Sequence, residues 1–100
     1  GSSTLKASAQ TGLLGVPLPE GAKLIKRTPA DPASGRDPSE RYTVSASAPE
    51  IAAFFNQAMP RAGWAKDAVS TNTALIFRKG NLMIGVLISR RGGTFTLMGS

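Results

Sequence analysis

The feature that most constrains the fold is a single capped amphipathic helix that begins near the middle of the chain. Ser47-Ala48-Pro49-Glu50 has the S-x-x-E spacing of a capping box, with a proline in the first turn, where its missing N–H costs nothing. Gly63 is the expected residue after the helix end, and Pro60 is expected to loosen the last turn. Apolar side chains recur at helical spacing, at Ile51, Phe54, Phe55, Ala58 and Met59. This stripe predicts that one side of the helix packs on a sheet.

The segments on both sides of this helix have the patterns of strands. Apolar and hydroxyl residues alternate along Arg41–Ser47, whereas Leu82–Ser89 is apolar on both faces and is expected to lie centrally. Gly80-Asn81 and Arg90–Gly93 have the composition of hairpin turns. The expected strands are Ala22–Thr28, Arg41–Ser47, Ala74–Lys79, Leu82–Ser89 and Thr94–Met98, with Trp64–Val69 as a candidate for a short additional one. The sequence therefore predicts an α+β fold, with one helix packed on a four- to five-stranded, mainly antiparallel sheet in the order β-β-α-β-β-β.

Two irregular stretches set the expected domain limits. Residues 1–16 are rich in Ser, Thr, Ala and Gly without any strand or helix period, so we expect a flexible tail or tether, with Gly1-Ser2-Ser3 as an expression remnant. Pro29–Ser39 holds three prolines and is expected to form a loop. Residues 17–100 then form one domain. No apolar run approaches the roughly 20 residues of a membrane helix, so we expect no membrane-spanning segment.

The residue types absent from the chain limit its chemistry. There is no cysteine and no histidine, which excludes disulfides, thiolate catalysis, Cys/His zinc sites and every Ser–His relay within this chain. Among the six acidic residues, Glu50 belongs to the helix cap, and Asp31 and Asp37 precede prolines that begin turns. A calcium site between these two aspartates is an alternative, although the spacing of an EF-hand is missing. We expect no catalytic residue, metal or cofactor; a small enzyme that works through Asp, Lys or Tyr side chains remains an alternative.

Positive charge is the remaining functional signal, because 12 Lys and Arg against six Asp and Glu leave a net charge of +6. The candidate polyanion-binding residues are Lys23, Lys26, Arg27, Arg78, Lys79, Arg90 and Arg91. Strand reversal predicts that Arg78-Lys79 and Arg90-Arg91 lie at opposite ends of adjacent strands. Nucleic-acid binding also favours exposed aromatic side chains; five of the six aromatic residues are assigned to the core, and the position of Tyr42 is ambiguous. A small basic nucleic-acid or polyanion-binding domain is therefore the alternative function.

Several short segments occur in an order that suggests a class of proteins. They are Pro19-Glu20-Gly21-Ala22 before a strand, Arg41–Ser45, Ala48–Phe55, and Ala62-Gly63-Trp64 before a hairpin. Over about residues 17–98 the chain resembles a loose class of small domains in bacterial envelope proteins and lipoproteins. The resemblance implies a non-catalytic accessory or interaction domain that is exported or membrane-tethered and binds an unknown protein or envelope partner. A cytoplasmic location stays open.

Overall fold

The predicted helix is present and begins at the predicted cap. In this computed structural model, which describes residues 7–68, 70–71 and 73–99, helix α1 runs over Ala48–Arg61 with Ser47 as its N-cap. The Ser47 hydroxyl accepts a hydrogen bond from the Glu50 backbone N–H at 3.3 Å, and the Glu50 carboxylate accepts one from the Ser47 N–H at 3.2 Å. Pro60 lies inside the last turn, and the chain leaves the helix through Gly63 at φ +92°. The capping box and the helix stop are therefore confirmed.

The main sheet is antiparallel and has six strands in the order β3-β4-β8-β7-β6-β5, where four or five were predicted. The additional strand is the two-residue β5, which pairs with β6. Strand β7 lies between β8 and β6, so its predicted central position is confirmed. The strands are β3 (Lys23–Thr28), β4 (Ser39–Thr43), β5 (Ala65–Lys66), β6 (Ala74–Lys79), β7 (Leu82–Ile88) and β8 (Thr94–Gly99).

The N-terminal segment differs from the expected tail over residues 1–16. Strand β1 (Ala7–Thr11) pairs antiparallel with β2 (Pro17–Pro19), and the 3₁₀ turn η1 (Leu13–Gly15) connects them. Val16 and Leu18 are buried at 0% and 3% exposure, which makes this hairpin part of the hydrophobic core. Residues 1–6, including the expected expression remnant, lie outside the described residues.

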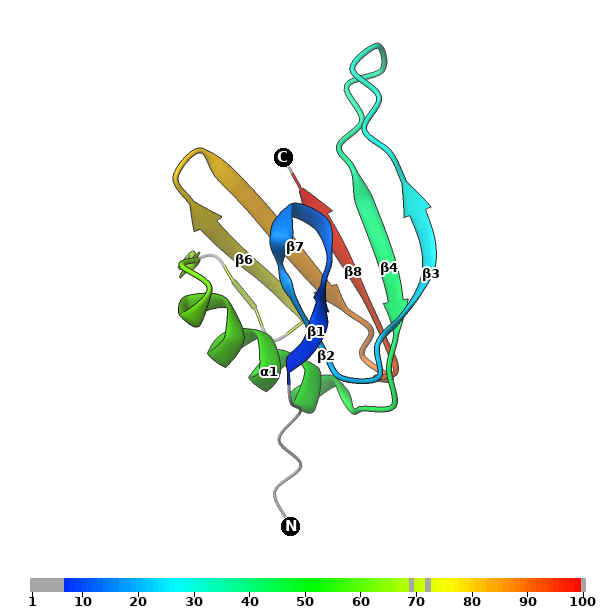
Figure 1. The fold of residues 1–100 in the computed structure, drawn as a ribbon, viewed down its shortest axis with the longest axis vertical. Helices are drawn as coiled ribbons and strands as arrows, with labels where there is room; N and C mark the ends of the chain where they lie inside the picture. Colours follow the sequence, from blue (N-terminus) through cyan, green and yellow to red (C-terminus); the bar gives the residue numbers. More distant parts are fainter. Residues whose placement is uncertain (1–6, 69, 72, 100) are drawn as a thin grey trace.

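Helix α1 and the β1–β2 hairpin lie on the same face of the sheet (Figure 1). The side chains on this inner face are buried and come from every strand between β4 and β6. Among the described residues no element covers the opposite, outer face, to which the alternate residues of each strand point. The buried hydrophobic residues are Val16, Leu18, Tyr42, Val44, Ile51, Phe54, Phe55, Met59, Trp64, Leu75, Phe77, Ile84, Val86, Ile88, Phe95 and Leu97.

The β3–β4 hairpin is irregular in two places. Its connection, predicted as a loop over Pro29–Ser39, projects beyond the rest of the sheet (Figure 1) and is closed by an isolated bridge between Asp31 and Arg36. The pairing shifts between Leu24 and Lys26, so Ile25 forms a bulge on this edge strand. Strand β4 begins at Ser39 and ends at Thr43, earlier than the predicted Arg41–Ser47, because the chain after Thr43 bonds the β7–β8 turn at Gly93 instead.

Replacement of Ser47 by alanine tests the helix start. Ser47→Ala removes the acceptor for the Glu50 N–H, and the free energy of unfolding should fall by about 1 kcal/mol. The measurement is chemical denaturation, with Ser45→Ala as the control, since Ser45 is also exposed but lies before the cap. Equal stability of the two variants would show that the cap does not hold the helix.

Candidate functional site

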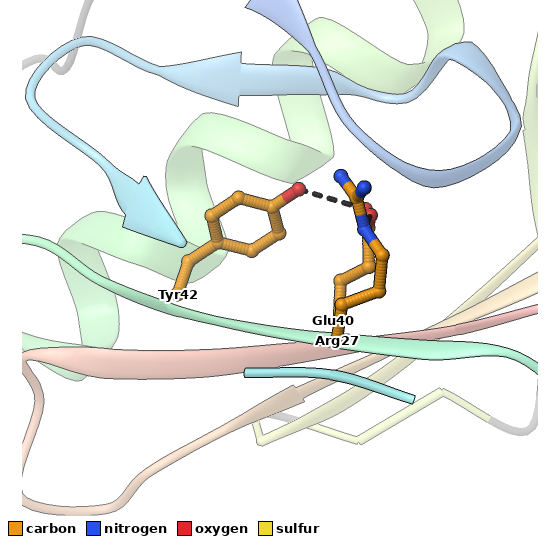
Figure 2. A network of polar contacts seen from close by, with 3 residues as sticks. All are labelled: Arg27, Glu40 and Tyr42. Carbon is orange, nitrogen blue, oxygen red and sulfur yellow. Dashed lines mark hydrogen bonds and ion pairs between the residues drawn. The ribbon is translucent and has the colours of Figure 1, made fainter. Parts of the chain in front are cut away.

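The most buried charged group in the described structure is the carboxylate of Glu40, at 5% exposure. Glu40 points from β4 to the inner face, between Arg27 of β3 and Tyr42 of its own strand (Figure 2). The Arg27 Nε donates to Glu40 Oε2 at 2.7 Å, and the Tyr42 hydroxyl donates to Glu40 Oε1 at 2.7 Å. Both carboxylate oxygens therefore have a charged or polar partner, which offsets the cost of removing the charge from water.

The phenol of Tyr42 is held in its neutral form by this arrangement. Burial, the hydrogen bond that it donates to Glu40 and the charge of that carboxylate together raise the pKa of Tyr42 to about 12, against a small opposing effect of Arg27. The Tyr42 ring stacks on Phe95, with 5.4 Å between the ring centroids. Above it, a Cβ at Gly12 would lie 3.1 Å from the hydroxyl, so the absence of a side chain lets the N-terminal segment close over the phenol. The network thus joins β3 to β4, and the segment at Gly12 packs closely against its phenol.

A cleft of about 540 Å³ lies beside this network, between the β1–β2 hairpin and β3. Thr11 and Leu18 line it from the hairpin, and Lys23, Leu24 and Arg27 line it from β3. Two of the ionisable groups that border the cleft, Arg27 and Tyr42, are engaged with Glu40. Lys23 also lines the cleft, and its side chain forms no ion pair with any residue that the structure describes.

The seven predicted cations are spread over the sheet. Arg27 binds Glu40, Arg78 pairs with Asp67 at 2.9 Å, and Lys79 donates to the Ala62 carbonyl at 3.0 Å. The Lys79 ammonium also lies 6.0 Å from the centre of the Trp64 ring. Arg78 and Lys79 come before the β6–β7 turn, and Arg90 and Arg91 lie in the β7–β8 turn at the other end of the strands. The prediction that these two pairs lie at opposite ends of adjacent strands is confirmed.

Arg41 is a surface cation that the sequence analysis did not select. It lies on β4, directly opposite Lys26 of β3 and Thr96 of β8, and its side chain is exposed. The alternation of Tyr42 and Val44 indicates that Arg41 points away from the core, but only the strand register shows that Lys26 is its neighbour. The structure therefore brings together one predicted and one unpredicted cation on the outer face.

Apolar residues continue this outer face across β8 and β7. Leu87, opposite Thr96, is 43% exposed, and Met98, opposite Gly85, is 42% exposed. Leu87 and Met98 occupy diagonal positions on neighbouring strands, close enough for long side chains to meet. The outer face thus has a cationic half on β3 and β4 and an apolar half on β7 and β8.

A second hollow, of about 580 Å³, lies between α1 and the β7–β8 turn. The small side chains of Ala48, Ala52 and Ala53 line it, with Arg90 at its edge. Within the described residues no group of three or more Asp or Glu side chains is placed to hold a metal ion. No described helix has the length and apolar character needed to cross a membrane.

Comparison with known proteins adds no relative, because no family model, no curated protein and no solved structure matches the chain.

The titration of Tyr42 tests the buried network. The pKa of Tyr42 in the folded chain is about 12, against 10 for a free phenol, so the folded state holds this proton more tightly than the unfolded state. The resulting stabilisation is fully present below pH 10 and is lost as the pH rises to 12, by up to about 2–3 kcal/mol. Tyr42 is the single tyrosine of the chain, so phenolate absorbance reports it directly.

The matched variant is Tyr42→Phe, which keeps the stacked ring and removes the titrating group. Its stability should be lower than that of the wild type at pH 7, and its loss of stability between pH 10 and 12 should be smaller. A tyrosine that titrates near pH 10 in the folded protein would contradict the network.

Proposed function

We propose that this chain is a non-catalytic interaction domain that binds a partner across the outer face of its sheet. The observation that carries the proposal is the exposure of Leu87 and Met98, side by side on strands that no other described element covers. Contiguous exposed apolar groups with polar residues around them are typical of binding surfaces rather than of inert ones. The well-packed inner face supplies the rigid base.

The charge on this face indicates the chemistry of the partner. Lys26 and Arg41 lie beside the apolar half, and Thr96 of β8, which lies opposite both Arg41 and Leu87, is uncharged. The carboxylate on strand β4, that of Glu40, is on the inner face and already binds Arg27. A partner that places negative charge over β3 and β4 and apolar groups over β7 would match both halves.

The location that we propose is the bacterial cell envelope, and the support is the resemblance of the segments between Pro19 and Trp64 to envelope domains. The gene sequence upstream of Gly1 tests it. An export signal, a lipid-attachment cysteine or a membrane helix is expected there, and the absence of all three would contradict this location.

Two pairs of leucine and methionine variants test the binding face. Leu87→Ser with Met98→Ser removes the apolar half, while Leu14→Ser with Leu82→Ser removes two side chains of similar exposure, 40% and 42%, elsewhere on the molecule. A partner is first isolated from envelope extracts on the immobilised wild-type domain, and its affinity for each variant is then measured. The first pair should weaken binding at least tenfold and the second less than twofold. Equal affinities of both pairs would contradict the proposed face.

The alternative function is polyanion binding, and the juxtaposition of Lys26 and Arg41 favours it. All six aromatic side chains, Tyr42 included, are buried, so the described surface has no aromatic ring on which bases could stack. Such binding would therefore depend on backbone phosphates or sulfates and fall steeply with salt. The wild type should then stay on a heparin column above about 0.2 M salt. Elution below that concentration would indicate only screened, non-specific charge.

A further inference from the structure

A small cleft of about 190 Å³ lies on the cationic half of the outer face, where β3, β4 and β8 meet. Its lining is Lys26, Thr28, Ser39, Arg41 and Thr96. Every one of these side chains carries a hydrogen-bond donor, and none is acidic. The lining is therefore complementary to a ligand that only accepts hydrogen bonds.

The strand register explains why these side chains converge. Lys26 lies opposite Arg41, Thr28 lies opposite Ser39, and Arg41 lies opposite Thr96 on the next strand. Directly opposed side chains on one face have Cβ atoms about 5 Å apart, so the five form a compact block across three strands. The bulge at Ile25 sets this register, because without it Lys26 would move out of line with Arg41.

Lys26 and Arg41 repel each other across the two strands. Like charges directly across an antiparallel pair destabilise the sheet. The neighbouring acidic residue on β4, Glu40, points to the other face and does not offset these charges. Lys26 and Arg41 have no ion pair with any described residue, in contrast to Arg27 and Arg78. A bound anion would replace this repulsion with two attractive contacts.

We propose that this cleft binds a phosphate or sulfate group. The two positive charges match a dianion, the Arg41 guanidinium offers paired donors to two oxygens, and the hydroxyls of Thr28, Ser39 and Thr96 can reach the others. A carboxylate has one charge and two oxygens and would leave part of this donor set unused. The proposal rests on the proposed function, since it names the anionic group that a partner would place on the outer face.

The surroundings of the cleft indicate how the group is carried. Arg41 and Thr96 also line an adjoining hollow of about 230 Å³ that reaches Leu87. A phosphate bound between Lys26 and Arg41 would therefore have an apolar surface next to it. The shared chemistry is an oxyanion, which is either a free ion or part of the headgroup of a lipid. The experiment separates these two sources.

The test is a titration of the isotope-labelled chain with inorganic phosphate, sulfate and acetate. Amide NMR shifts report binding, and a chloride salt keeps the ionic strength constant. Phosphate and sulfate should shift the amides of residues 26–28, 39–41 and 96 and should saturate. Lys26→Gln and Arg41→Gln should each weaken phosphate binding at least tenfold. Arg91→Gln, which removes the same charge from an exposed turn outside the cleft, should change it less than twofold. Thr96→Val keeps both cations and should weaken it about threefold.

Thermal unfolding of each variant verifies that it is folded before its affinity is compared. Equal losses in Arg41→Gln and Arg91→Gln would overturn the proposal, because they would show general charge screening. Acetate affinity equal to that of phosphate would also overturn it.

Vesicles of neutral lipid, with and without an anionic phospholipid, then identify the source. Arg41-dependent binding to the anionic vesicles supports a lipid headgroup, and phosphate binding without vesicle binding supports a soluble ligand. A chain that loses its envelope partner in the Leu87→Ser, Met98→Ser variant but does not bind phosphate would retain the proposed function and refute the oxyanion site. If the chain binds phosphate but the Leu87→Ser, Met98→Ser variant keeps its partner, the oxyanion site is retained and the proposed function is refuted.

Discussion

One helix is too narrow to cover the sheet that this chain forms, and the rest of the structure follows from that mismatch. An α-helix is about 10 Å across, whereas six strands about 4.8 Å apart span about 24 Å. Helix α1 covers the inner face toward β5 and β7, and the β1–β2 hairpin with η1 covers the remainder over β8. The N-terminal segment thus completes the core, through Val16 and Leu18. Because both covering elements lie on one face, no described element covers the other face.

A charge becomes buried where the β1–β2 hairpin meets the edge of the sheet. Glu40 faces inward near the edge strand β3, and its burial would be costly without Arg27 and Tyr42. Arg27 extends from the exposed edge strand and Tyr42 lies in the hydrophobic core, so the network connects the edge of the sheet with the core. Gly12 permits the covering segment to approach the phenol closely. Close packing at Gly12 thereby places the hairpin against the buried network.

Local patterns in the sequence predicted helix α1 and the strands of the main sheet, but not the β1–β2 hairpin. The cap at Ser47, the stop at Gly63 and the hairpins after Lys79 and Ile88 follow from signals within a few residues. Strand β1 has no such signal, because it is defined by its pairing with Pro17–Pro19 and by the burial of Val16 and Leu18 after it. The cleft at Lys26 was missed for a related reason: the β3–β4 connection is long, and a single bulge decides which residue lies opposite Arg41.

The bulge at Ile25 also determines how far the sheet can grow. An edge strand offers unpaired N–H and C=O groups to any extended chain, and long regular edges invite one copy of a protein to add to the next. On β3 the bulge interrupts the even spacing of these groups, and Lys23, Lys26 and Arg27 would bring like charges together in a second copy. The β3 edge is thus a poor template for a further strand.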